Sequence, residues 1–422
     1  MTVVESTRVL AAGSPRELVR AAFSDVEHDY TRGSIRRAVV VLAIPMVLEM
    51  GMESLFAIVD IFFVAFLGPA AIAAVGLTEA LMTLLYAVGV GLGLGVTALV
   101  ARRIDAGDAE GAAVVAGQSV WLGLAVCALV AVCGAVYAEE LLRLMGADAA
   151  VIAQGTGYTR VLFGGSFTVV YLFLFNAVFR GAGAPLIALR ALVLANTINI
   201  LLDPCFIFGL GPFPALGVSG AAVATTCGRS VGVAYLVWVL MRRSPRVRLE
   251  WRHLRPRVAI IARLVAVSLG GIVQFLIATA SWVVLMRLMS VYGAAAIAGY
   301  TVAIRIMDFT ILPAWGLSNA AATLVGQNLG AGSIARARAS AWTVTAYCIA
   351  FMLAIACLFV FANELLVGLF VSTPEVARHA ADCLRYVAYC YGFLGASLAL
   401  THVALHVNLD KTPSPRRETL SA

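Results

Sequence analysis

The stretch LAIPMVLEMGMESLFAIVDIFFVAFLG (42–68) places three acidic residues inside an apolar segment that is long enough to cross a membrane. Glu49, Glu53 and Asp60 are four and then seven residues apart, so a helix carries all three in one narrow stripe. Carboxylates are costly at the centre of a bilayer and usually face a protein interior or a water-filled path. This face of the helix is therefore predicted to avoid lipid and to take part in ion or substrate passage.

The composition of the whole chain indicates an integral membrane protein. Of its 422 residues 62% are apolar and 13% are charged, whereas soluble domains have about 45–50% apolar residues. About ten continuous apolar segments of spanning length lie between Arg37 and Val407. The eight cysteines show no CxxC spacing and are interpreted as small buried hydrophobes. The predicted fold class is therefore an all-α polytopic membrane protein with about ten transmembrane helices.

Arginine-rich connections set the predicted topology. The segment 242–257 carries seven arginines against one acid, Glu250, which is typical of a cytoplasmic linker. The loops after the second and fourth predicted spans also carry arginine, namely Arg102 and Arg103 in the first of them and Arg180 in the other. Loops on this side of the membrane are therefore predicted to be cytoplasmic, and so are both termini. The expected parts are an N-terminal cytoplasmic tail with room for an amphipathic helix (1–37), a first lobe of six helices (38–241), the basic linker (242–257), a second lobe of four helices (258–407) and a polar C-terminal tail (408–422).

The second half of the chain begins as a repeat of the first. A shift of 225 residues aligns GPAAIAAVGL (68–77) with GAAAIAGYTV (293–302), and ALVARRIDAGDAEGA (98–112) with TLVGQNLGAGSIARA (323–337). Because an even number of spans separates the copies, the repeats are predicted to be parallel. The first half continues for two further helices, whereas the second half reaches a polar tail. Six plus four helices are therefore expected, with a truncated second lobe.

Several motifs follow one another along the chain: VDIFFVAFLG (59–68), AAIAAVGL (70–77), FRGAGAP (179–185), TINILLDP (197–204), FPALGVSGAAVAT (213–225) and LVGQNLGAG (324–332). In this order they resemble the multidrug and toxic compound extrusion (MATE) family of secondary transporters over about 36–413. The resemblance implies a MATE-like two-lobe helical bundle that exchanges a proton or a sodium ion for an organic, often cationic, compound.

The resemblance also implies a coupling-ion site in the first lobe. By comparison with family members that use this lobe, Asp60 and Asp203 would bind the ion, and Asn199, Asn176 and Thr225 would accompany them. Members that use the second lobe carry an acid early in the seventh span, where this chain has Gln274, so no coupling is expected there.

The residues themselves agree with such a site. Asn199 and Asp203 are four apart and share a helix face, so the amide can hold the carboxylate. Two carboxylates close together in a poorly solvated place cannot both be ionised cheaply. They would share a proton, or hold a sodium ion at Asp60 and Asp203. Glu49, Glu53 and Glu79 have two open interpretations, an acidic substrate path or hydrogen bonds within the lobe.

The leading function is an ion-coupled antiporter that exports organic, cationic compounds across the cytoplasmic membrane. Two alternatives stay open: a truncated, transport-defective MATE-like fragment, and a flippase for a lipid-linked precursor. No enzyme motif such as HExxH or GxSxG is present, and no phosphate-binding GxxxxGK[ST] follows a strand. His402 and His406 share a helix face without a third ligand, so no metal site is predicted. Apart from the coupling ion no cofactor is expected; the partners are a small organic substrate and the lipid bilayer, not nucleic acid, and the protein is expected to be a monomer.

Overall fold

The computed structural model describes residues 14–24, 30–242, 246–289, 294–370 and 374–409. These residues are helical almost throughout and contain no strand. They divide into two compact units: a central unit, Met52–Ile272, and a terminal unit, Met1–Gly51 with Val273–Ala422. The boundaries fall inside two long helices, whereas the sequence placed the division at the basic linker. The division into lobes at that linker stays a prediction.

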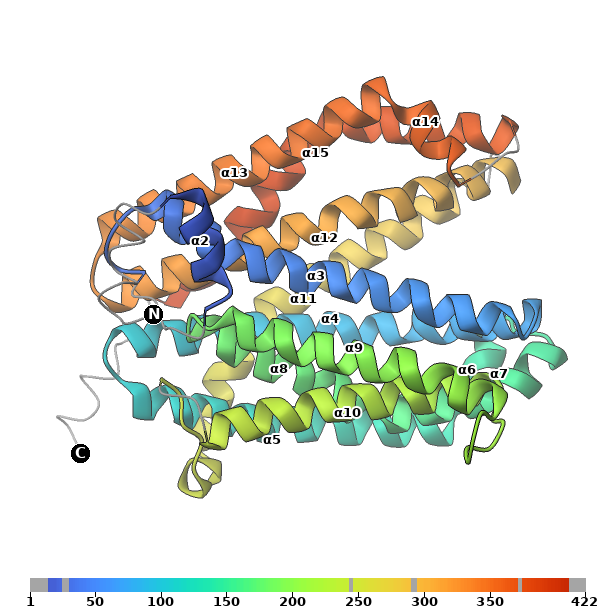
Figure 1. Ribbon diagram of the computed structural model, residues 1–422, viewed down its shortest axis with the longest axis horizontal. Helices are drawn as coiled ribbons and strands as arrows, with labels where there is room; N and C mark the ends of the chain where they lie inside the picture. Colours follow the sequence, from blue (N-terminus) through green and yellow to red (C-terminus); the bar gives the residue numbers. More distant parts are fainter. Residues whose placement is uncertain (1–13, 25–29, 243–245, 290–293, 371–373, 410–422) are drawn as a thin grey trace. The chain divides into compact units, whose positions relative to one another are not determined.

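The helices follow the apolar segments closely (Figure 1). The longer ones are α3 (Ile35–Ala65), α4 (Pro69–Asp105), α5 (Ala109–Val136), α7 (Ala149–Gly164), α8 (Ser166–Gly181), α9 (Pro185–Phe208), α10 (Val218–Arg242), α11 (Val258–Met289), α12 (Ala294–Gly330), α13 (Ile334–Phe361) and α15 (Pro374–Leu409). Four short helices lie between or before them: α2 (Pro15–Ala22), α6 (Ala138–Leu144), η1 (Trp251–Leu254) and α14 (Asn363–Gly368).

Among the described residues eight helices are long and apolar enough to cross a membrane, namely α3, α4, α5, α9, α10, α11, α13 and α15. One of the predicted apolar spans, 155–179, is a pair of helices, α7 and α8, bent by 40°. The pair makes a ninth span if it crosses once, and the remaining predicted span, near 294–325, lies in α12. The bend falls at Gly164 and Gly165, and glycine pairs are a common cause of such kinks.

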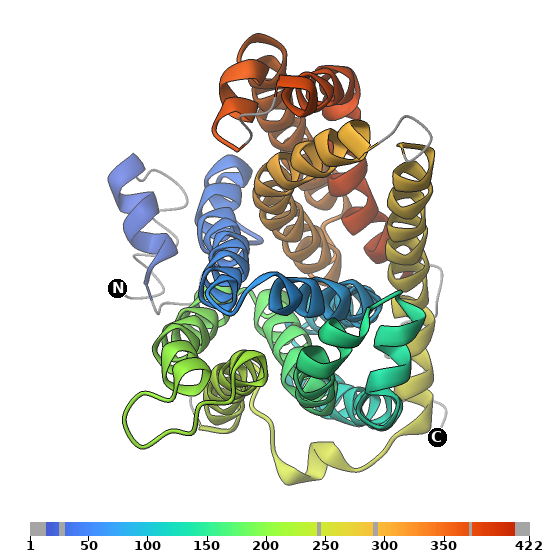
Figure 2. The same cartoon turned by 90° about the vertical axis from the view of Figure 1, so that its right-hand side faces the viewer.

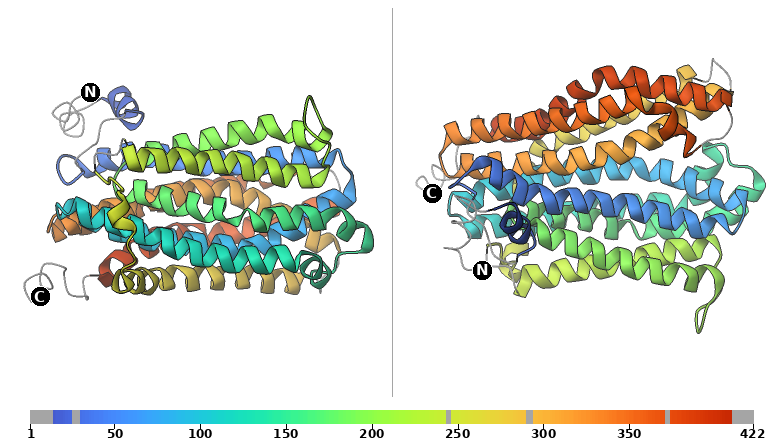
Figure 3. Two further views of the ribbon diagram at one scale, coloured as in Figure 1. Left: turned by 90° about the horizontal axis from the view of Figure 1, so that it is seen from below. Right: turned by 45° about the horizontal axis from the view of Figure 1, so that its top comes forward.

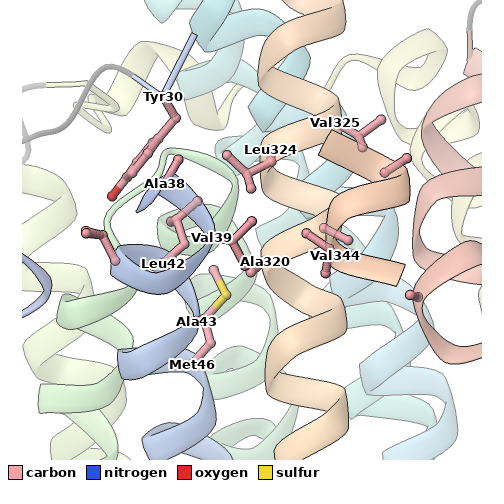
Figure 4. Packing of buried hydrophobic residues seen from close by; sticks show 14 of the residues in the cluster. Tyr30, Ala38, Val39, Leu42, Ala43, Met46, Ala320, Leu324, Val325 and Val344 are labelled. Atoms are coloured by element: carbon pink, nitrogen blue, oxygen red, sulfur yellow. The ribbon is translucent and has the colours of Figure 1, made fainter. Parts of the chain in front are cut away.

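The core of the terminal unit is packed from small and branched side chains. Figure 4 shows Leu42 and Met46 of α3 directed toward Ala320 and Leu324 of α12, and all four are buried. Gly316 of α12 lets the backbone of α3 approach, since a Cβ there would lie 2.7 Å from the Met46 carbonyl oxygen. Helices in membranes associate mainly through such close packing, because lipid is as apolar as the side chains.

The N-terminal segment contains a short amphipathic helix, α2, as its sequence predicted. Ser14 and Glu17 form a capping box at the start of α2, and Leu18 is buried in the terminal unit's core. Arg336 at the start of α13 fixes the chain that follows, donating to the carbonyl oxygens of Tyr30, Arg32 and Gly33 at 3.2, 3.0 and 2.9 Å. Residues 14–24 and 30–33 of this segment therefore belong to the packed part of the terminal unit.

The basic linker is folded onto α5 in the central unit. Figure 2 shows η1 in the yellow segment between α10 and α11. Gln118 of α5 is fully buried, and its amide donates to the carbonyl oxygens of His253 and Arg255 at 2.9 and 3.0 Å while accepting from the Arg257 N–H at 2.7 Å. Gly117 leaves room for the linker backbone to touch the helix. One side chain thus satisfies three backbone groups of the linker.

Replacing Gln118 by Leu is expected to destabilise the purified protein by about 3 kcal/mol, because two carbonyl oxygens and an N–H lose their partner at once. Thermal unfolding in detergent measures the change. Gln327 of α12 offers a matched control: it is also fully buried, and neither atom of its amide has a hydrogen-bond partner among the described residues. Gln327→Leu should leave stability equal or higher, and an equal loss in both variants would contradict the role given to Gln118.

Candidate functional site

Four of the polar residues predicted from the sequence come together in the central unit. Asp60 lies on α3, Asn199 and Asp203 on α9, and Thr225 on α10. All four side chains are buried, with at most 4% exposed. The site therefore joins α3 with two consecutive helices, α9 and α10, that follow much later in the sequence.

Hydrogen bonds connect the four side chains into one network. The Asn199 amide donates to Asp203 Oδ1 at 3.1 Å and to the Thr225 hydroxyl oxygen at 3.4 Å. The Thr225 hydroxyl in turn is hydrogen-bonded to the Asp60 side chain. Since that hydroxyl accepts from Asn199, its own proton is available for Asp60. The network runs without a break from one carboxylate to the other.

Glycines of α10 bring the network together by letting α9 approach. The two helices lie side by side along their length (Figure 3). A Cβ on Gly228 would lie 2.5 Å from the Ala195 carbonyl oxygen, and one on Gly232 would lie 3.1 Å from that of Ala191. Spacing of four residues places small side chains in one stripe, the arrangement that permits close helix contact in membranes. This contact sets Thr225 opposite Asn199.

Three oxygen atoms of the network are buried and accept no hydrogen bond from any described residue. They are Asp60 Oδ1, Asn199 Oδ1 and Asp203 Oδ2. Buried acceptors are nearly always satisfied, and an exception calls for a bound group. Oxygen acceptors with two carboxylates among them suit a hard cation or a shared proton. The arrangement therefore has the oxygen acceptors and the negative charge that binding of a small cation requires.

Charged and phenolic groups of other helices surround Asp60. Glu79 of α4 and Arg229 of α10 interact electrostatically with it, and Tyr158 of α7 is 2% exposed and interacts with both acids. Thr78 of α4 and Thr159 of α7 are hydrogen-bonded at 2.7 Å and hold these two helices together. Asp60 is thus enclosed by protein on several sides.

The remaining predicted residues are distributed differently. Asn176 is buried on α8, where its participation in the ion site stays a prediction. Glu53 and Glu79 belong to the central unit, whereas Glu49, only 1% exposed, belongs to the terminal unit. The acidic stripe of α3 is therefore divided between the two units. Gln274 donates to the Thr401 hydroxyl at 3.1 Å within the terminal unit, a neutral pair.

Two buried arginines were missed as site residues. Arg180, predicted to lie in a cytoplasmic loop, is in the last turn of α8 with 7% of its surface exposed, and Arg229 lies inside α10. Both interact electrostatically with Glu53. For Arg229 the signal was present in the sequence, because a charged residue inside an apolar span marks a functional position by default. For Arg180 the adjoining GAGAP turn favoured a loop.

Comparison with known proteins gives the identity of the fold. The family model MatE matches residues 45–205 and 271–408, which is more than half of the chain. The chain belongs to the MATE family of transporters. A solved structure described as the outward-facing conformation of a multidrug resistance MATE family transporter is 28% identical, with a TM-score of 0.80, covering 90% of this chain and 85% of the other. The predicted helical MATE-like fold is thereby confirmed.

The names of two similar proteins refer to different cargo. A FAD transporter of Shewanella oneidensis is 26% identical over 371 residues, covering 87% of this chain and 81% of that protein. A probable multidrug resistance protein NorM of Thermotoga maritima is 28% identical, covering 71% of this chain and 64% of its own length. A further structure, from Pyrococcus furiosus, has 27% identity and a TM-score of 0.78, and its description refers to reverse polarity of the binding pocket. Membership of the MATE family therefore leaves the cargo open.

Proposed function

We propose that this protein is an antiporter of the cytoplasmic membrane that exchanges a proton or sodium ion for an organic compound. The observation that carries the proposal is the set of three buried oxygen acceptors, from Asp60, Asn199 and Asp203, that no described group satisfies. A cation entering there neutralises two carboxylates and bonds the free oxygens. Family membership supports coupling of that binding to transport. Both termini are proposed to be cytoplasmic, and the protein to act as a monomer.

We propose an organic cation as the cargo. Asp60, Asp203, Glu53 and Glu79 provide four carboxylates against the two guanidinium groups of Arg180 and Arg229, so acids are in excess among these residues. An excess of acids concentrates cations and disfavours anions through the local field. An anionic dinucleotide is a second candidate, because the two arginines lie near Glu53 and a relative is named as a FAD transporter.

Purified protein in liposomes tests the proposal. An outward-directed or inward-directed gradient of protons or sodium ions is imposed, and uptake of a cationic dye such as ethidium is compared with uptake of FAD. We expect gradient-driven movement of the dye that collapses when an ionophore dissipates the gradient. Movement of FAD instead would support the second cargo. Rates equal to those of protein-free liposomes for both compounds under both gradients would contradict an ion-coupled antiporter.

A further inference from the structure

Arg229 is a buried cation held in place by three neighbours. Only 8% of it is exposed, and its guanidinium lies 4.7 Å from the centre of the Phe56 ring. It is hydrogen-bonded to Tyr86 of α4 and interacts electrostatically with Glu53. An arginine stays protonated in proteins, and a stacked guanidinium is well suited to a desolvated place. The central unit therefore contains a permanent positive charge in a fixed position.

The same arginine interacts with the ion site. Asp60 and Arg229 attract each other electrostatically. On α3, Phe56 precedes Asp60 by one turn, and on α10, Arg229 follows Thr225 by one turn. The two helices thus present adjacent layers, one with Asp60 bonded to Thr225 and one with Phe56 against Arg229. The guanidinium is one layer from the carboxylate to which a coupling cation would bind.

A second cation beside Asp60 meets repulsion from this charge. In a protein interior the effective dielectric constant is far below that of water. A unit charge one or two helical turns from an ion site therefore still changes the affinity of that site for its ion appreciably. Glu53 has the opposite effect, since it attracts the guanidinium from the side away from Asp60: the two acids are seven residues apart on α3, with Phe56 between them. The arginine is shared by two carboxylates.

We propose that Arg229 is a positioning residue that competes with the coupling cation for Asp60. When the cation binds, the guanidinium of Arg229 is balanced mainly by the carboxylate of Glu53. This inference rests on the proposed function and adds what sets the ion affinity. That affinity depends on an internal cation, Arg229, as well as on the oxygen atoms of the site. An empty site keeps Asp60 partly balanced by Arg229. A loaded site shifts that balance toward the Glu53–Arg229 pair.

Equilibrium binding to the purified protein in detergent tests the proposal. Radioactive sodium in choline chloride buffer reports sodium affinity, and an indicator dye reports proton affinity. Arg229→Gln is expected to raise cation affinity about tenfold, because the repulsion is removed. Glu53→Gln should lower it about tenfold, because the whole arginine charge then acts on Asp60. The other titratable groups that face Asp60, namely Glu79 of α4, Tyr158 of α7 and Asp203 of α9, are unchanged in these variants.

Two further variants separate charge from structure. The double variant Glu53→Gln, Arg229→Gln should return to within about threefold of the wild-type affinity, since the opposing charges leave together. Arg229→Lys keeps the charge and should lie closer to wild type than Arg229→Gln does. Simple damage to the fold would lower affinity in every variant. Shifts of the two single variants in the same direction, or no shift in either, would overturn the proposal.

Asp60→Asn in the same assay separates this inference from the function on which it rests. If Asp60→Asn removes cation binding while the Glu53 and Arg229 variants bind as wild type, the ion site stands and the competition is wrong. If Asp60→Asn binds both cations as wild type does, the proposed ion site itself is wrong and the inference fails with it.

Discussion

Asp60→Asn should reduce ion-driven exchange to the level of protein-free liposomes while the protein reaches the membrane at normal abundance. The substitution keeps the shape of the side chain and leaves an oxygen that can accept the Thr225 hydroxyl proton, so the packing of α3 against α10 is retained. It removes one of two negative charges and an oxygen that has no donor among the described residues. The affinity of the site for a cation is then expected to fall, because both the charge and the oxygen ligand are missing.

Asp308→Asn is the matched control for this experiment. Asp308 is an exposed acid of α12 that lies one turn from Arg305 and interacts with it electrostatically. The same chemical change there should leave exchange intact. Exchange at the wild-type rate in Asp60→Asn would assign that carboxylate a structural role only. Loss of exchange in both variants would indicate a general sensitivity to removal of acids.

Gly228→Val should destabilise the central unit by about 3 kcal/mol, the upper end of what overpacking usually costs. A Cβ at this position would meet the Ala195 carbonyl oxygen at 2.5 Å and the Asn199 backbone nitrogen at 3.1 Å, and backbone atoms cannot rotate away. The helices α9 and α10 must separate, which also breaks the contact from Asn199 to Thr225. Membrane abundance and the unfolding temperature in detergent are both expected to fall.

Gly76→Val is the control for this second change. Gly76 also lies inside a helix, α4, but a Cβ there has no atom within 4 Å. Valine favours the helix slightly over glycine, so stability should be unchanged or higher. A similar loss in both variants would mean that glycine flexibility, and not close contact with α9, matters at Gly228.

The sequence allowed prediction of those site features that depend on local spacing. Asn199 and Asp203 are one turn apart on one helix, and their hydrogen bond follows from the helical period. The helices also follow from continuous apolar runs. Contacts between helices were not accessible in this way: Thr225 was named through resemblance, and the pairing of Arg229 with Phe56 depends on the register of α10 against α3.

Other differences have equally specific causes. The bend at Gly165 interrupts an apolar run that contains no proline, so hydropathy alone predicts a single span. The linker carries seven arginines, a composition that predicts a solvated loop. In the structure the buried amide of Gln118 holds the backbone of His253 and Arg257 against α5. The division of the acidic stripe between Glu49 and Glu53 depends on which neighbours each part of α3 meets. These features are determined by tertiary packing, which cannot be predicted from hydropathy or residue spacing.

The small-residue stripe on α10 has a translational consequence. Gly220, Ala224, Gly228 and Gly232 repeat every four residues, so the smooth surface that α9 contacts is nearly reproduced after an axial shift of one turn, about 5.4 Å. Such a shift toward the start of α10 would carry Arg229 to the level that Thr225 now occupies opposite Asp60. One-turn ratchets of packed elements are a known form of two-state switching. The stripe would then allow a sliding motion in which a guanidinium replaces a hydroxyl beside the same carboxylate.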